Sequence, residues 1–387
     1  MQFSQWYQAH FEDRIKGRYL PLQSILPLLK EYAQEFEISV IGSSENGVEI
    51  PCIEIGTGKK VILAWSQMHG NESTTTKSIF DFLKLISQKD HFQDEISHFL
   101  KKHRLVIIPI LNPDGAALYT RENANEVDLN RDAKNLSQSE SRALRELFDH
   151  IEPDLCLNMH DQRTIYGLSN GRPATLSFLS PAADAKCSIT PARRTAMDLI
   201  EGIAGYLQQI IPGQVGRYDD SFNENCVGDT FQMQEVPTIL FEAGHYPGDY
   251  HRETTREYIF YALCKLTGLI QGKPTPENTT DYLSIPENQQ NFRDVILRNV
   301  HVKGVEGLTS VALQFEELLI DGAIHWQAQV DSIGDLDHLF GHEEIDGKSA
   351  NILMNSYENV FVGAKVIEIF ADNATKQVFF RDSSINI

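Results

Sequence analysis

Along the first 270 residues, short apolar runs of strand length repeatedly end in polar residues. There are four such runs: Val61–Trp65, Leu105–Leu111, Leu155–Met159 and Val236–Phe241. Their length and β-branched content are typical of strands that are buried on both faces of a parallel sheet. Amphipathic stretches between the runs predict helices. This alternation predicts an α/β fold with a mixed, largely parallel sheet and helices on both faces.

The rest of this part of the chain predicts further elements of the same fold. Helices are expected at Leu22–Phe36, from Ile79 to Ile86, after the capping box Ser137–Glu140, from Thr190 to Leu207 and from Tyr258 to Leu269. Two antiparallel strands, Ile38–Gly42 and Val48–Ile55, are expected around the turn signal Asn46-Gly47. The polar stretch 112–131 and the aperiodic stretch 161–189 are expected to be loops, the second one over the site.

The pattern changes after the stretch Gln271–Asn278, which has the composition of a linker. Beyond it, strands are expected at Val311–Leu319, Ile324–Val330 and Val360–Phe370, and Asn291–Val300 is expected to be a helix. The sequence therefore predicts two domains. Residues 1–275 would form the α/β domain, and residues 276–387 would form a small β-rich domain.

The polar residues after the four apolar runs are the candidate chemistry. The runs lead into His69–Glu72, Asn112–Gly115, His160 and Glu242–Gly244, respectively. In an open α/β sheet, ligands bind outside the carboxyl ends of the strands, so these residues are expected to form one site. His69 and Glu72 provide two of the three ligands of an open, catalytic zinc site, and Gly70 would allow the tight turn between them. The alternative is that they are loop residues without a joint role.

Composition excludes several classes of partner. The net charge of -20 argues against nucleic acid or an anionic membrane as a partner. No apolar run reaches the roughly 18 residues of a membrane-spanning helix, and the N-terminus does not read as a signal peptide. The five cysteines are scattered and odd in number, which fits reduced thiols and predicts a cytoplasmic protein. A homo-oligomer is compatible with the sequence, which does not define the oligomeric state.

The candidate residues, taken together, resemble the zinc carboxypeptidase (carboxypeptidase A-like) family in that family's order. The resemblance covers roughly residues 40–270 and rests on these motifs: His69-Gly70-Asn71-Glu72, Asn112-Pro113-Asp114-Gly115, Arg121, Asp128-Leu129-Asn130-Arg131, His160 and Phe241-Glu242. It implies that His69, Glu72 and His160 bind one zinc ion. It also implies that Glu242 is the general base.

The resemblance further implies that Arg121 polarises the scissile carbonyl, while Asn130 and Arg131 hold the terminal carboxylate of the substrate. The expected activity is hydrolysis of a C-terminal amide bond, in a peptide or small peptide-like substrate, by a zinc-bound water that Glu242 activates. Other interpretations remain for individual residues. Arg131 and Asp128 could form an ordinary loop ion pair, and Glu242 could be a structural carboxylate.

The sequence departs from the family in places, and this leaves the substrate class open. Asp161 follows His160 where digestive relatives usually carry a small residue and an aromatic one, and Tyr218 is only roughly in range for the phenol that covers the substrate. His245 and His251 are interpreted as surface residues or as residues near the site that do not bind the metal. The four C-terminal histidines are interpreted as surface or core residues: His301, His325, His338 and His342.

Two other functions compete with the carboxypeptidase hypothesis. A deacylase of N-acyl amino acids, similar to succinylglutamate desuccinylase and aspartoacylase, would use the same zinc ligands, the same base and the same Asn-Arg pair. The Asp114-Gly115 turn favours the peptidase, whereas the C-terminal β domain favours the deacylase. The third hypothesis, a non-catalytic zinc-fold binding module, is weakened because every ligand and base position is filled.

Overall fold

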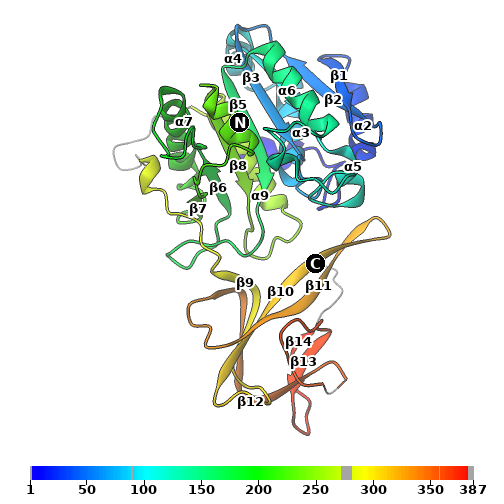
Figure 1. Ribbon diagram of the computed structural model, residues 1–387, viewed down its shortest axis with the longest axis vertical. Helices are drawn as coiled ribbons and strands as arrows, with labels where there is room; N and C mark the ends of the chain where they lie inside the picture. Colours follow the sequence, from blue (N-terminus) through cyan, green and yellow to red (C-terminus); the bar gives the residue numbers. More distant parts are fainter. Residues whose placement is uncertain (1, 89, 272–280, 357, 382–387) are drawn as a thin grey trace. The chain divides into compact units, whose positions relative to one another are not determined.

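The computed structural model describes residues 2–88, 90–271, 281–356 and 358–381 (Figure 1). The chain forms two compact units. The first comprises residues 1–162 and 174–288, and the second comprises residues 163–173 and 289–387. The predicted linker is Gln271–Asn278, and all of it except Gln271 lies outside the described residues. The predicted domain boundary at 275 lies there too and stays a prediction.

The first unit is built on an eight-stranded sheet in the order β1-β2-β4-β3-β5-β8-β6-β7. Its strands are β1 (Glu37–Ser43), β2 (Glu49–Ile55), β3 (Lys60–Ser66), β4 (His103–Ile108), β5 (Leu155–Asp161), β6 (Leu176–Leu179), β7 (Val215–Arg217) and β8 (Thr238–Ala243). The four predicted buried strands are β4, β3, β5 and β8, which are adjacent and parallel. The antiparallel pair β1–β2 is also confirmed. Their common direction brings the polar residues at their carboxyl ends to one edge.

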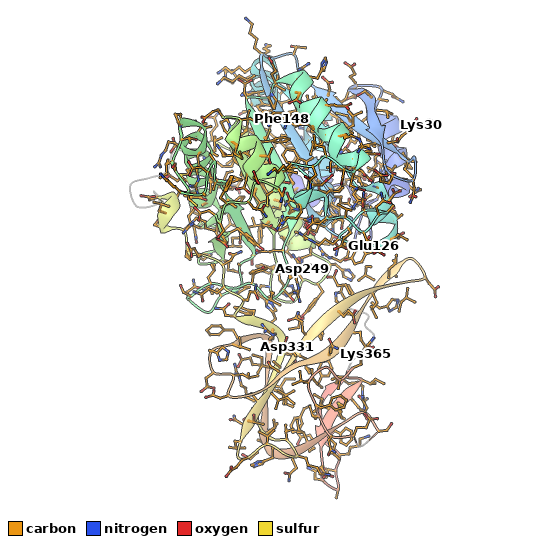
Figure 2. The ribbon with its side chains drawn as sticks, in the orientation of Figure 1. Lys30, Glu126, Phe148, Asp249, Asp331 and Lys365 are labelled. Atoms are coloured by element: carbon orange, nitrogen blue, oxygen red, sulfur yellow. The ribbon has the colours of Figure 1, made fainter. Side chains whose placement is uncertain are left out.

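Helices cover both faces of this sheet, as predicted. They are α1 (Phe3–His10), α2 (Leu22–Tyr32), α3 (Thr74–Ser87), α4 (Gln93–Lys102), α5 (Pro113–Leu118), α6 (Ser139–Ile151), α7 (Pro191–Leu207), α8 (Val227–Met233) and α9 (Glu253–Leu266). One core contains side chains of α3, α7 and α9, and the other contains side chains of α6 and α8. Phe148 of α6, labelled in Figure 2, stacks on Phe231 of α8 with 3.8 Å between ring centroids. Burial on both faces explains why the central strands are continuous apolar runs.

Three local predictions for this unit are wrong. The stretch 112–131 is not only loop, because α5 and the short 3₁₀ helix Leu129–Arg131 lie in it. The stretch 161–189 contains strand β6. The capping box at Ser137 does not form: α6 begins at Ser139, and the Ser137 hydroxyl donates to Asp132 instead. By contrast, Thr190 caps α7 as predicted, since its side chain accepts a hydrogen bond from the backbone of Arg193.

The second unit contains a six-stranded sheet in the order β11-β10-β9-β12-β13-β14. Its strands are β9 (Phe292–His301), β10 (Thr309–Ile320), β11 (Ala323–Gly334), β12 (Phe340–Met354), β13 (Glu368–Ala371) and β14 (Val378–Arg381). The β-rich character and two of the predicted strands, β10 and β11, are confirmed. These two form a hairpin whose turn is Asp321-Gly322, with positive φ at both residues.

The predicted helix at Asn291–Val300 is wrong, because this segment is strand β9. Val295 and Leu297 face one core and Ile296 faces another, so the strand is buried on both faces and its sequence does not alternate. Strand β12 was not predicted, because it has few apolar residues. Of the predicted strand at Val360–Phe370, only the last residues belong to β13.

The five cysteines are free thiols, in agreement with the sequence. Within the described parts of the chain, no helix combines the length and the apolar character needed to cross a membrane.

Candidate metal centre

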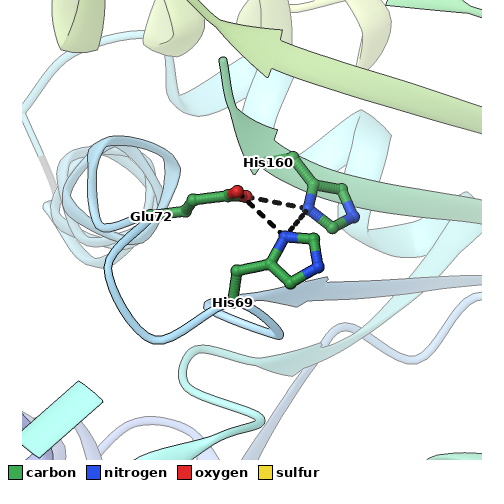
Figure 3. Close-up of side chains that lie close together, drawn as sticks. All are labelled: His69, Glu72 and His160. Atoms are coloured by element: carbon green, nitrogen blue, oxygen red, sulfur yellow. Dashed lines mark hydrogen bonds and ion pairs between the residues drawn. The ribbon is translucent and has the colours of Figure 1, made fainter. Parts of the chain in front are cut away.

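The carboxyl ends of β3 and β5 bring His69, Glu72 and His160 to one point (Figure 3). Nδ1 of His69 lies 2.9 Å from Oε1 of Glu72 and 3.1 Å from Nδ1 of His160. Nδ1 of His160 lies 2.9 Å from Oε2 of Glu72. All three side chains are buried. The structure therefore brings the three predicted metal ligands together.

These three groups fit a metal ion. Burial lowers the pKa of His160, which favours the neutral imidazole that can coordinate a metal. Around zinc, with bonds of about 2.0–2.1 Å, tetrahedral ligand atoms lie about 3.3 Å apart, which is close to the observed distances. Two imidazole nitrogens and a carboxylate that face one another in a buried position have few other means of satisfying their lone pairs. Within the described residues this is the only group of metal-ligating side chains.

The loop that carries His69 and Glu72 is held by close contact with α5. A Cβ atom on Gly70 would lie 2.0 Å from the carbonyl carbon of Gly115, so no side chain fits there. The Asn112 side chain donates a hydrogen bond to the carbonyl of Met68. Gly70 is thus required by the close approach of two backbones. The predicted tight turn is present, since the backbone N–H of Glu72 donates to the carbonyl of His69, but this turn does not itself require glycine because the φ of Gly70 is not positive.

Asp128 and Arg121 contact the ligand group from outside. Oδ1 of Asp128 lies 2.9 Å from Nε2 of His69, and Arg121 donates both to Asp128 and to Glu72. Burial alone would raise the pKa of Asp128, but the hydrogen bond to His69 and the charge of Arg121 hold it well below its usual value. A carboxylate in this position orients the imidazole of a metal ligand.

The sequence did not give Asp128 this role. From the sequence, Asp128 was interpreted only as part of the motif and as an ion-pair partner of Arg131. In the structure it pairs with Arg121. The general tendency of metal-binding histidines to carry a carboxylate partner is the one signal that could have pointed to it.

Glu242 lies beside the ligand group on the neighbouring strand. It is paired in register with His160, so both side chains point to the same face of the sheet. Its carboxylate is buried, and Oε2 has no hydrogen-bond partner among the residues that the structure describes. Burial, and then the negative charges of Glu72 and Asp161, raise the pKa of Glu242 well above its usual value. A carboxylate with a raised pKa can take up a proton near neutral pH.

Asn130 and Arg131 lie in the 3₁₀ helix that Asp128 caps. The side-chain oxygen of Asn130 accepts a hydrogen bond from the backbone of Val227, at the start of α8. The Arg131 guanidinium is exposed and donates to the carbonyl of Asn130. Their role in substrate binding stays a prediction. The same holds for Tyr218, whose backbone donates to Phe178.

The other histidines of interest lie outside the ligand group. The ring of His245 packs against Tyr250, with 4.6 Å between centroids. In the second unit, His301 bonds to the carbonyl of Gly307, and His342 bonds to the carbonyl of Thr164. None of these rings joins a metal-ligating group among the described residues.

Asp229, on α8, is a buried carboxyl that the sequence did not single out. Burial raises its pKa to about 7. In the unfolded chain the same group loses its proton near pH 4. As the pH rises from about 4 to about 7, the unfolded state therefore gives up a proton that the folded state keeps, and the free energy of unfolding falls.

Asp229→Asn is expected to remove this pH dependence, because asparagine stays neutral. The free energy of unfolding of the variant should exceed that of the wild type by about 1–3 kcal/mol at pH 8 and should equal it near pH 4. Urea unfolding at the two pH values measures the difference. Asp198→Asn, at a position that is 61% exposed on α7, serves as the control. Its difference from the wild type in the free energy of unfolding should be the same at both pH values. A constant difference for Asp229→Asn would contradict the raised pKa.

Comparison with known proteins shows which family this part of the chain resembles. Residues 22–167 match the sequence model of the zinc carboxypeptidase family. This match covers less than half of the chain. The matched segment includes all three residues of the ligand group, together with Arg121, Asp128, Asn130 and Arg131. Glu242 lies beyond the matched segment, on the neighbouring strand of the same sheet.

Two curated proteins similar to part of the chain come from Trichophyton species. The chain is 28% identical over 133 residues to carboxypeptidase 2 of Trichophyton rubrum and to probable carboxypeptidase 2 of Trichophyton verrucosum. The match covers 34% of this chain, but only 23% and 24% of those proteins, respectively. The chain thus matches about a quarter of the length of these relatives.

Solved structures share the fold over a longer part of the chain. The putative carboxypeptidase A of Shewanella denitrificans has a TM-score of 0.53 at 16% identity, and the match covers 65% of this chain and 70% of that one. Bovine thrombin-activatable fibrinolysis inhibitor has a TM-score of 0.52 at 13% identity, with 65% of this chain and 96% of that one covered. These likenesses confirm the predicted α/β fold.

Proposed function

We propose that the protein is a zinc-dependent metallocarboxypeptidase that removes the C-terminal residue from a peptide or a small peptide-like substrate. The observation that carries the proposal is the buried group of His69, Glu72 and His160 with Glu242 beside it in register. The zinc carboxypeptidase family implies zinc as the cofactor, and the ligand types agree with zinc. When bound in such a site, zinc lowers the pKa of water at its open position to about 7.

The chain supplies the proton transfers and the charge that this reaction needs. Glu242, with its raised pKa, would accept a proton from the attacking water and pass it to the leaving amine. Arg121 would stabilise the negative charge that develops on the carbonyl oxygen. Its guanidinium is already held at the site by Glu72 and Asp128, so it need not be ordered during the reaction.

Asn130 and Arg131 would select a substrate with a free terminal carboxylate. The guanidinium of Arg131 presents a planar fork that matches a carboxylate, and Asn130 adds an amide donor. The side-chain oxygen of Asn130 is bonded to α8, which fixes the orientation of the amide. This pair makes an exopeptidase the preferred function over an endopeptidase.

The experiment that tests the proposal is hydrolysis of a mixed panel with and without chelator. The panel contains dipeptides, peptides with free or amidated C-termini, and N-acyl amino acids. We expect chelator-sensitive release of C-terminal residues that is fast from the free peptides and slow from the amidated ones. Turnover confined to N-acyl amino acids would favour the deacylase, which can use the same site residues. Metal binding without any turnover would favour a binding module.

Arg131→Ala provides a further prediction for the same panel. Loss of the fork should raise KM for free peptides by about 10- to 100-fold, because a charge-assisted pair is worth roughly 1.5–3 kcal/mol. It should leave the slow turnover of C-terminally amidated peptides unchanged. Steady-state kinetics on matched free and amidated peptides measure this. An equal loss on both substrates would contradict a carboxylate-binding role.

A further inference from the structure

The segment of residues 11–20, called here the N-terminal brace, has no regular secondary structure but is held by many polar contacts. Arg256 of α9 donates to the carbonyls of Glu12 and Ile15, at 2.7 Å each. The backbone of Glu12 donates to Asp81 of α3, and the backbone of Gly17 donates to Glu253 of α9. The brace is thus fixed along two helices of the first unit. It also lies before residue 22, where the match to the zinc carboxypeptidase family begins.

Arg18 connects the brace to the end of β5. Its Nη1 lies 2.7 Å from Oδ2 of Asp161 and 2.9 Å from the hydroxyl of Thr74. The Thr74 hydroxyl donates to the same oxygen of Asp161, at 2.6 Å. The side chains of Arg18 and Asp161 are 5% and 2% exposed, respectively, so this ion pair is almost fully removed from water.

Asp161 in turn contacts a metal ligand. Its backbone N–H donates to Oε2 of Glu72 at 3.1 Å, and this is the oxygen that also faces Nδ1 of His160. Asp161 directly follows His160 on β5, so it is adjacent to two of the three ligands. The Asp161 backbone is therefore one of the groups that hold the Glu72 carboxylate in place, together with Arg121.

Two more contacts link the brace to the loop that carries the other ligands. The hydroxyl of Ser73, next to Glu72, donates to the carbonyl of Arg18 at 2.5 Å. The side-chain amide of Gln67 donates to the carbonyl of Leu20 at 3.1 Å and to that of Gly70 at 2.9 Å. The brace thus contacts both segments that provide metal ligands.

We infer that the N-terminal brace is part of the metal centre and that Arg18 is a positioning residue, acting through Asp161 on Glu72. This inference rests on the metal-binding part of the proposed function. Without Arg18, the buried Asp161 carboxylate would lose its cation, and a buried charge without a partner is strongly unfavourable. The Asp161 side chain would have to move toward another partner, and its backbone N–H would move away from Glu72. The departure from the family at Asp161 then acquires a physical reason.

The test compares the metal affinity of variants that remove a buried arginine from an ion pair at two places. Arg18→Met removes the cation at the brace and keeps the length of the side chain. Arg193→Met is the matched control. Arg193, on α7, is also buried, and it pairs with Asp220 at 2.5 Å. Zinc affinity is measured by competition with a chromogenic chelator. Cobalt is loaded in a parallel sample, because its visible absorption reports the coordination geometry.

We expect Arg18→Met to weaken zinc binding by about 10- to 100-fold, the range for partners that orient metal ligands. Its cobalt spectrum should change as well. Arg193→Met should lower stability but leave both readings as in the wild type. Arg18→Lys, which can still donate to Asp161, should restore most of the affinity. Affinity of Arg18→Met within twofold of Arg193→Met, with an unchanged cobalt spectrum, would overturn the inference.

A milder variant covers the case in which Arg18→Met does not fold. Thr74→Val keeps the shape of the side chain and removes only the hydroxyl shared by Arg18 and Asp161. It should weaken zinc binding by about threefold to tenfold, below the range for a lost ion-pair partner. Wild-type zinc affinity in Thr74→Val would then refute the inference. These readings need no substrate, so an inactive protein that binds zinc would refute the proposed peptidase without affecting this test.

Discussion

Glu242→Gln is expected to lower kcat by about 10²- to 10⁴-fold, the usual contribution of a general acid–base group, while zinc remains bound. Glutamine has the size of glutamate but cannot accept the proton of the attacking water. Glu242 is not one of the three converging ligands, so the metal should stay in place. The measurement is the initial rate on the substrate found in the panel, together with the zinc content of the purified variant.

Glu257→Gln is the matched control for this prediction. Glu257 lies on α9, and burial raises the pKa of its carboxyl as it does for Glu242. Its side chain contacts Tyr261 rather than the ligand group. The control should therefore have wild-type kcat. If both variants lost activity equally, the effect would come from removing a buried carboxyl from the fold and not from loss of a base.

The pH dependence of the wild type follows from the same residue. Glu242 must be ionised to accept a proton, and its pKa is raised by burial and by nearby carboxylates. Activity should therefore fall as the pH drops through this raised pKa, at a higher pH than for an ordinary glutamate of pKa about 4.3. The acid limb of kcat/KM against pH measures this. A limb at or below pH 4 would contradict the raised pKa.

The central part of the fold could be predicted because its physical cause is local. Val61–Trp65 is apolar throughout and Leu155–Met159 is apolar except for Asn158, since both faces of β3 and β5 are buried. The candidate site was readable for the same reason, because polar residues that end such strands have to meet at one edge of a parallel sheet. His69, Glu72 and His160 were found in this way.

Other features could not be read because their cause lies far away in the sequence. Strand β9 has the spacing of a helix, and only its neighbours β10 and β12 make it a strand. Asp128 and His69 are 59 residues apart, and Arg18 and Asp161 are 143 residues apart. No local pattern connects such residues. The turn at Gly70 was predicted, but the need for glycine there was not, because the backbone that excludes a side chain belongs to α5.

Glu72→Gln is expected to abolish tight zinc binding in a protein that still folds. Glu72 is the only anionic member of the ligand group. Glutamine can still accept the hydrogen bond from Asp161, but it offers one acceptor fewer and no charge to offset the cation. We expect zinc affinity to fall by more than the roughly 100-fold that marks the upper range for outer partners. Activity should fall with it, and chelator competition and rate measurements on one preparation test both.

Asp128→Asn provides a comparison for this result, because Asp128 contacts the ligand His69 directly and reaches Glu72 only through Arg121. The Asp128 carboxylate accepts the Nε2 proton of His69, which leaves the Nδ1 lone pair directed at the ligand group. Asparagine can accept the same proton without the charge, so affinity should fall by only about 10- to 100-fold. Asp149→Asn, at a position 52% exposed on α6, should change nothing. A loss for Asp128→Asn as large as that for Glu72→Gln would mean that Asp128 is itself a ligand, and that the metal lies between Nε2 of His69 and Asp128.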